Sequence, residues 1–185
     1  MRRIAAGLMV VMSVLLVSCK GKPGNTITVG SDKLDNTQSY FSESMHTVAR
    51  CDTGYYYLDK CSASDDNLIF YDDKSEESIV LCNKPQCGHD GEECMAYISG
   101  SEFKSELYYY NSYIYMISSK GNLVQISADG TQRTDLGSIC VLSGQDSVSM
   151  CFNDGYAYVS QEITGDIEGN VTVRLYRFNL DTGSS

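Results

Sequence analysis

The sequence lacks several features that would point to catalysis or to nucleic-acid binding. It has no tryptophan, two prolines and two histidines in 185 residues. Two histidines leave little imidazole for acid–base chemistry, and the sequence motifs of serine hydrolases, P-loop NTPases and dinucleotide-binding enzymes do not occur. The 24 acidic residues outnumber the 14 lysines and arginines, for a formal net charge of −10. Because such a chain repels nucleic acid and anionic lipid headgroups, we expect no nucleic-acid partner.

The N-terminal segment has the layout of a secretory leader that ends at a cysteine. Met1-Arg2-Arg3 is basic, and Ile4 to Val17 is an uncharged apolar run. That run has the length of a signal-peptide core and is too short to cross a bilayer of ~30 Å comfortably as a helix. Leu16-Val17-Ser18-Cys19 then has the residue types of a bacterial lipobox. The segment resembles bacterial lipoprotein precursors.

In that family the cysteine receives a diacylglyceryl group and becomes the new N-terminus. The resemblance implies a signal peptide at residues 1–18, and lipidated Cys19 with a flexible tether at 19–39, a stretch rich in glycine and polar residues. Two acyl chains, at ~0.8 kcal/mol per buried CH₂, anchor a protein stably. We therefore expect an extracytoplasmic protein that contacts the cell membrane through the lipid on Cys19. An ordinary secretory signal with a coincidental cysteine is the alternative.

Residues 40–185 repeat one pattern of short strands and turns. In the clearest copy, Leu107 to Gly137, tyrosine, isoleucine and valine fill the strands, and turns that carry Asn, Asp or Gly divide them. Strands are predicted at 107–110, 113–118, 123–127 and 131–136. The equivalent turns at Asp52, Asn111 and Asn153 give a mean period of about 50 residues, near that of four-stranded propeller blades. No helical stripe follows the signal peptide, so the sequence predicts an all-β fold.

Both faces of the segment Tyr113 to Ile117 are apolar or aromatic, as expected for a sheet held between neighbouring sheets. Leu123 to Gly130, and more weakly Leu175 to Asp181, resemble the TolB-like and YWTD-like repeats of six-bladed propellers in bacterial cell-surface lipoproteins. The resemblance implies about three four-stranded β-propeller blades, part of a propeller of roughly six to eight blades. The alternatives are a meander or sandwich with a tyrosine-rich core, and a short chain that closes by oligomerising or stays open.

The segment LCNKPQCGHDGEEC is the best candidate for a metal-binding or reactive site, and its Cys/His-rich part spans residues 82–94. Its proline and glycine bend the chain, so that the side chains of the spacing C-x4-C-x-H-x4-C could converge. Three thiolates and one imidazole are a tetrahedral zinc set, although the spacing is not one of the common zinc-finger spacings. The candidate ligands of a structural Zn²⁺ are Cys82, Cys87, His89 and Cys94.

Disulfides are the competing use of the cysteines. Of the eight cysteines, seven remain besides Cys19. Three metal thiolates would leave four cysteines for two disulfides, with Cys51–Cys61 and Cys140–Cys151 the nearest pairs in the sequence. Without metal, three disulfides would leave one free thiol. A catalytic or redox thiol is a third use, and the sequence leaves all of these open.

Fold and motifs together favour a binding or scaffolding module. We expect the loops of the propeller to contact a peptide, glycan or protein partner. The competing function is a propeller-based hydrolase or lyase whose catalytic residues lie largely outside this chain, and a purely structural envelope protein is a third. No catalytic or cofactor-binding residue is assigned from the sequence.

Overall fold

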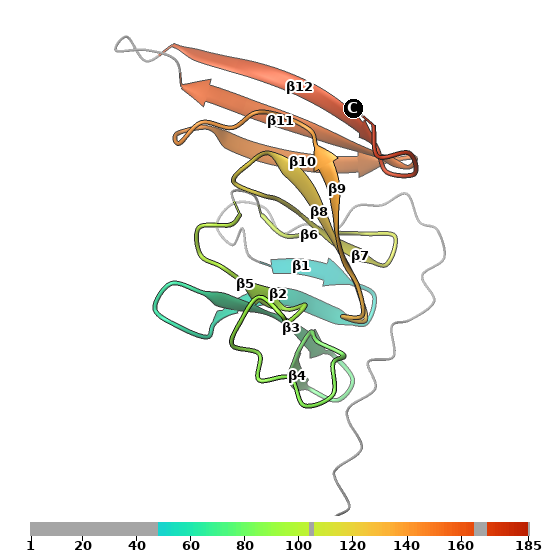
Figure 1. Cartoon of the computed structure of the whole chain (residues 1–185). Coiled ribbons are helices and arrows are strands. Elements are labelled where there is room, and N and C mark those ends of the chain that lie inside the picture. The colour runs from blue at the N-terminus through green and yellow to red at the C-terminus, as the bar shows by residue number, and fades with distance from the viewer. Residues whose placement is uncertain (1–47, 104–105, 165–169, 185) are drawn as a thin grey trace, which may run out of the picture.

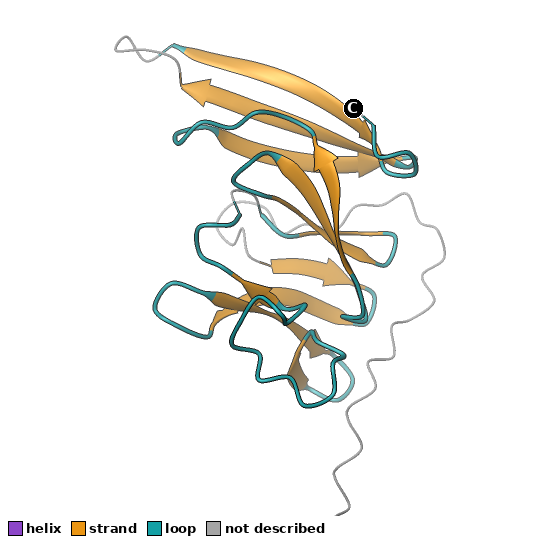
Figure 2. Ribbon diagram, viewed as in Figure 1, coloured by secondary structure: helices purple, strands orange, loops and turns teal. Residues whose placement is uncertain are grey.

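The computed structural model describes residues 48–103, 106–164 and 170–184. The regular structure in these residues consists of strands alone: twelve strands form three antiparallel sheets (Figures 1 and 2). This confirms the all-β prediction. Accordingly, this part of the chain contains no helix that could cross a membrane. Cys19, the signal peptide and the tether lie outside the described residues.

Each sheet is built from strands that follow one another in the chain. In the first, β1 (Val48–Cys51), β2 (Gly54–Lys60), β3 (Asp66–Asp72) and β4 (Glu77–Val80) pair in that order, and β5 (Tyr97–Ile98) pairs with β3. The second has the order β6 (Tyr108–Tyr110), β7 (Tyr113–Ile117), β8 (Asn122–Ser127), β9 (Arg133–Ser138). The third has the order β10 (Ser147–Asn153), β11 (Tyr156–Thr164), β12 (Val171–Asn179).

The first hairpin of each sheet turns where the sequence predicts it. Two-residue turns join Cys51 to Gly54, Tyr110 to Tyr113 and Asn153 to Tyr156. In the second sheet both turn residues, Asn111 and Ser112, have positive φ angles of 48° and 63°. Such mirror-image turns match the right-handed twist of the strands that they join. The three sheets are therefore repeats of one hairpin unit.

The central strand β7 of the second sheet is buried on both faces. Ile114 and Met116 pack into a core shared with the first sheet, and Tyr115 and Ile117 into a core shared with the third. All four side chains are at most 1 % exposed. This confirms that both faces of β7 are covered. Because fully burying a large apolar side chain contributes about 1.5–3 kcal/mol, the two cores hold the three sheets together.

Tyrosines make many of the contacts between sheets. The ring of Tyr56 stacks on that of Tyr109, with centroids 5.6 Å apart, and its hydroxyl donates to the carbonyl of Ala128 at 3.2 Å. Between the second and third sheets, the rings of Tyr110 and Phe152 stack at 5.1 Å. The rings supply apolar area, and the buried hydroxyl finds a hydrogen-bond partner, as a buried tyrosine requires.

The third sheet differs from the four-stranded expectation. It has three strands, and of the described residues beyond β12 only Ser184 pairs back, in a single bridge to Asn179. The predicted turn at residues 181–183 is present, with Gly183 at a φ of 66°. The stacked sheets of the described chain form no closed ring (Figure 1).

Candidate metal centre and adjoining hollow

The Cys/His-rich segment is a loop whose two ends are fixed to the same strand residue. The backbone N–H of Leu81 donates to the carbonyl of Leu68 in β3, and the N–H of Leu68 donates to the carbonyl of Ala96, both at 2.8 Å. Leu81 and Ala96 are fully buried in the core between the first and second sheets. The residues between them must therefore fold back on themselves outside the sheet.

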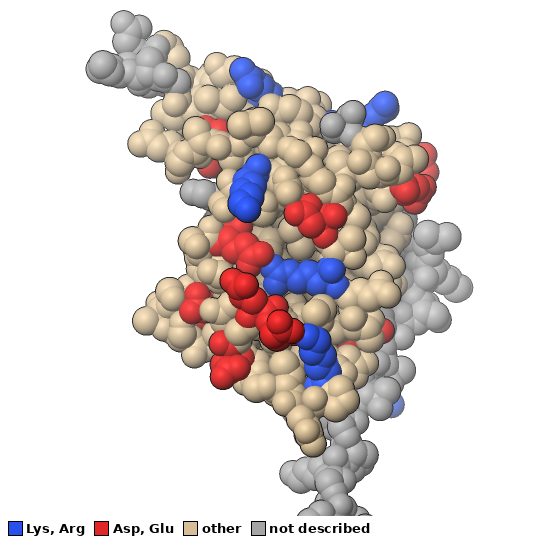
Figure 3. Space-filling view, in the orientation of Figure 1, with Lys and Arg blue, Asp and Glu red and all other residues tan. Residues whose placement is uncertain are grey.

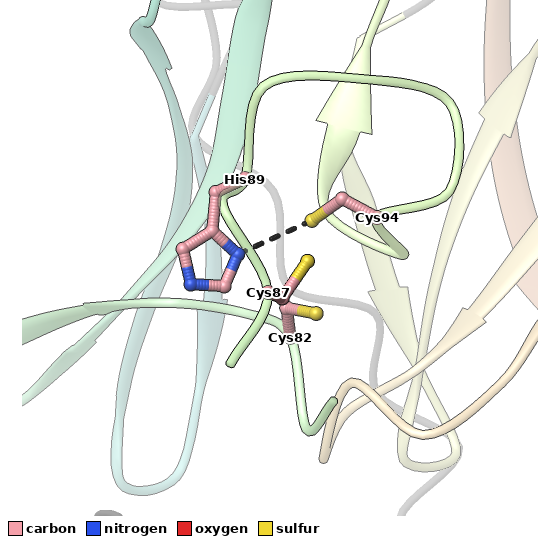
Figure 4. Close-up of side chains that lie close together, drawn as sticks. All are labelled: Cys82, Cys87, His89 and Cys94. Atoms are coloured by element: carbon pink, nitrogen blue, oxygen red, sulfur yellow. Dashed lines mark hydrogen bonds between the residues drawn. The ribbon is translucent and has the colours of Figure 1, made fainter. Parts of the chain in front are cut away.

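The fold of this loop brings all four predicted ligands together. One ligand atom from each of Cys82, Cys87, His89 and Cys94 lies within 4.8 Å of the others, and the side chains surround a shared space (Figure 4). The Nδ1 atom of His89 is 3.3 Å from the Sγ atom of Cys94. Zinc–sulfur bonds of about 2.3 Å would place sulfurs about 3.8 Å apart in a tetrahedron, so a small contraction fits the cluster to the ion.

Backbone strain marks the same loop. Gln86 and His89 have φ angles of 60° and 58°, which place non-glycine residues in the left-handed region. Such residues cost about 1–2 kcal/mol each and persist where their surroundings hold them. The ammonium group of Lys84 reaches across the loop to the carbonyl of Glu93 and lies 3.8 Å from its carboxylate. The loop thus keeps a conformation that its backbone would not adopt alone.

The thiols of the cluster differ in acidity. Burial, together with the hydrogen bonds to Cys82 and Cys87, raises the pKa of Cys94 to about 12. Burial also raises the pKa of Cys82, but the hydrogen bonds that it receives from the backbone of Lys84 and Met95 and from the neighbouring thiols together outweigh burial and leave that pKa below the ordinary value. Cys82 therefore loses its proton more readily than Cys94, and an ion that bound Cys94 would have to displace its proton.

The structure does not form the disulfides that are nearest in sequence. Cys51 and Cys61 flank the seven-residue strand β2, whose length is about 20 Å, whereas bonded cysteines have Cα atoms within about 7 Å. Cys140 is buried between the second and third sheets, but Cys151 is exposed and alternates along β10 with residues of that core. Every cysteine of the described residues has a free thiol.

A hollow of about 490 Å³ adjoins the cluster. The Cys/His-rich loop and its continuation form one wall, and the β7–β8 turn and β9 form the other. Arg133 of β9 joins the walls, because its guanidinium donates to the carbonyl of Tyr97 at 2.7 Å and pairs with the carboxylate of Glu102 at 2.5 Å. The lining includes Glu92, Cys94, Met95, Tyr97, Ser119 and Lys120.

Charges of both signs surround this part of the molecule. Figure 3 shows acidic and basic side chains side by side on this face, without a wide patch of one sign. The sequence missed the hollow, since its lining comes from three separate segments that carry no shared motif. No family model matches the chain, and no curated protein or solved structure matches it.

Proposed function

We propose that the chain is a membrane-anchored, extracytoplasmic binding module in which a structural zinc ion fixes one wall of a ligand-binding hollow. One observation carries the proposal. Cys94 belongs both to the cluster of four ligands and to the lining of the hollow. An ion held by the cluster would therefore determine the position of residues that a ligand touches.

The donor set supports a structural rather than a catalytic ion. Structural zinc sites are closed by four protein ligands, whereas catalytic sites use three and leave one position for water. All four ligands here come from one loop, and Cys94 is 2 % exposed. In the proposed site zinc offsets the strain at Gln86 and His89 and replaces the proton on Cys94. The site would order the loop instead of activating a substrate.

The hollow supports binding of a peptide, glycan or protein segment. Its volume lies in the range of about 300–1,000 Å³ that is typical of ligand sites. Lys120 and Glu92 offer charges of opposite sign, and Ser99, Ser101 and Ser119 offer hydroxyls. Such a mixed lining suits a ligand rich in hydrogen-bonding groups better than an apolar one.

We further propose that the three sheets are blades of a β-propeller of roughly six to eight blades. The burial of β7 on both of its faces supports this, because the inner strands of a blade lie between two other blades. The hollow lies at the strand ends, where loops of adjacent sheets meet. In this arrangement the lipid on Cys19 holds the module at the outer side of the cell membrane, with the loops available to a partner.

Metal content tests the zinc site directly. We expect one zinc ion per chain in residues 20–185 purified without chelator or reductant, and an intact mass that corresponds to free thiols. His89→Ala should lower the bound zinc, whereas His46→Ala, at the other histidine of the chain, should not. Equal zinc in the two variants would exclude His89 from the site, and three disulfides without metal would exclude the site altogether.

Binding is tested on arrays of peptides and oligosaccharides. We expect Lys120→Glu to remove the interaction with those probes that the unaltered protein binds, and removal of zinc by a chelator to weaken it. Val141→Asp is the matched control, because Val141 is 83 % exposed and does not line the hollow. Binding that survives Lys120→Glu would place the ligand elsewhere. Binding that survives loss of zinc would show that ligand binding in the hollow does not depend on the metal.

A further inference from the structure

The outer face of the third sheet carries a row of exposed aliphatic side chains beside polar ones such as Ser160, Glu162 and Arg177. Its last strand, β12, exposes three aliphatic side chains, Val171 at 57 %, Val173 at 61 % and Leu175 at 73 %. This sheet lies at one end of the stack in Figure 1, and its inner face packs against the second sheet. Large aliphatic residues gathered on one exposed face mark an interaction site.

The pairing registers identify what this face corresponds to in the other sheets. The leucines Leu68, Leu123 and Leu175 occupy equivalent positions, since each pairs with the fifth residue after the first turn of its sheet. The first two are 0 % exposed and lie in the cores that join each sheet to the next one. Leu175 therefore occupies, in the third sheet, the position at which the first and second sheets each bury a leucine against the following sheet.

A tyrosine repeats in the same way. Tyr56, Tyr115 and Tyr158 are each the third residue of the second strand of their sheet. The ring of Tyr56 stacks on Tyr109 of the following sheet, and the ring of Tyr115 contacts Phe152 with centroids 4.7 Å apart. Tyr158 and Leu175 thus share the face of the third sheet that corresponds to the covered faces of the other two.

The opposite end of the stack offers the complementary surface. Ile114 and Met116, the second and fourth residues of β7, contact the first sheet. The equivalent residues of the first sheet are Tyr55 and Tyr57, which are half-buried on the side away from the second sheet. In the second sheet, the residues at these positions pack against the sheet before it. In the first sheet, the residues at the same positions lie on its outer side.

We propose that the outer face of the third sheet docks on the outer face of the first sheet of a second copy of this chain. The contact continues the two sheet-on-sheet interfaces that one copy already contains, with the same strand positions on each side. It joins two different surfaces, so it is head to tail, and it closes into a ring where the rotation allows. The described residues of two copies would then supply six sheets in one ring, and the outer faces of the first and third sheets would both be covered.

Sedimentation velocity of residues 20–185 over a wide range of concentration tests the proposal. We expect dimers whose dissociation constant rises at least about tenfold in Leu175→Glu, because a charge would enter the interface. Leu175 is largely exposed in one copy, so the variant should fold, and circular dichroism with urea unfolding checks this. Val141→Glu, on the loop between β9 and β10, is the matched control and should dimerise normally.

Mixing two variants tests the head-to-tail arrangement. Tyr57→Glu should also weaken the dimer, since it alters the first-sheet face. An equimolar mixture of Leu175→Glu and Tyr57→Glu should recover association, because one of the two interfaces in the mixed dimer is then unaltered on both sides. A protein that stays monomeric at every concentration, or a Leu175→Glu variant that associates normally, would overturn the proposal. Normal dimers of Tyr57→Glu would overturn its head-to-tail form.

Discussion

Gly130 makes a close contact between the second sheet and the start of the Cys/His-rich loop. It lies in the β8–β9 turn with a φ of 69°, and a Cβ atom built there would be 2.6 Å from the carbonyl oxygen of Leu81. Its own carbonyl accepts from the N–H of Asn83 at 3.3 Å. An alanine at this position would therefore be strained in its backbone and crowded against the chain just before Cys82.

The cost of Gly130→Ala has two parts, and Gly155 separates them. Gly155 has a φ of 79°, but the nearest atom to its Cβ position is a carboxylate oxygen of Asp181 at 3.9 Å. Gly155→Ala should therefore cost only the left-handed strain, about 1–2 kcal/mol. Gly130→Ala adds overpacking against backbone, about 1–3 kcal/mol, for a total of about 2–5 kcal/mol. That is a large part of the about 5–15 kcal/mol that stabilises a typical domain.

Urea unfolding at 25 °C measures both losses, and the two transitions are comparable where the m-values agree. We expect Gly130→Ala to lose more than Gly155→Ala by the overpacking cost, and also to lower the zinc content because Leu81 precedes a ligand. Equal losses of stability would show that Leu81 does not limit the space at Gly130. That result would contradict the close contact between Gly130 of the second sheet and Leu81 at the start of the loop.

Three other predictions concern separate parts of the chain. Leu123→Ala, in the core between the second and third sheets, should lower the free energy of unfolding by about 2–5 kcal/mol in the same assay, and a loss near zero would contradict that burial. Hydrogen bonds from Ser143, with one from Gln161, hold the pKa of Asp146 below its ordinary value. Its stabilising effect is therefore present at neutral pH and is lost as pH falls through the folded-state pKa. Asp146→Asn should show a smaller loss of stability on acidification than the unaltered chain, and equal losses would point to other groups. Cys19→Ser should release the protein from the membrane fraction and abolish lipid labelling, and unchanged anchoring would contradict the lipoprotein prediction.

The sequence predicts the local parts of this structure well. The strands of the second sheet lie within two residues of their predicted bounds, because runs of tyrosine and isoleucine alternate with turns such as Asn111-Ser112. The four candidate ligands converge because they lie on one short loop. Contacts between distant segments were not predictable in this way. Lys120 and Arg133 reach the hollow from separate elements, and β5 pairs with β3 across the whole loop.

The suggested disulfide pairs show the same limit in a different form. Cys51 and Cys61 are close in sequence, but an extended strand carries its two ends apart faster than any other regular element. Closeness in sequence therefore predicted correctly that the ligands of the bent segment containing Pro85 and Gly88 meet. It gave a wrong pairing for Cys51 and Cys61, because the chain between them is an extended strand. The path of the backbone decides which near neighbours in sequence can meet.

The three consecutive tyrosines of β6 have a consequence for the alignment of the second sheet. A strand with one apolar face resists a slip of one residue, because the slip would turn that face to solvent. Tyr108, Tyr109 and Tyr110 would place a tyrosine on either core after such a slip, so hydrophobic pattern says little about alignment here. The alignment depends instead on the left-handed pair Asn111-Ser112, which fixes where the hairpin folds. Two small polar residues at the surface thus decide which tyrosine enters which core.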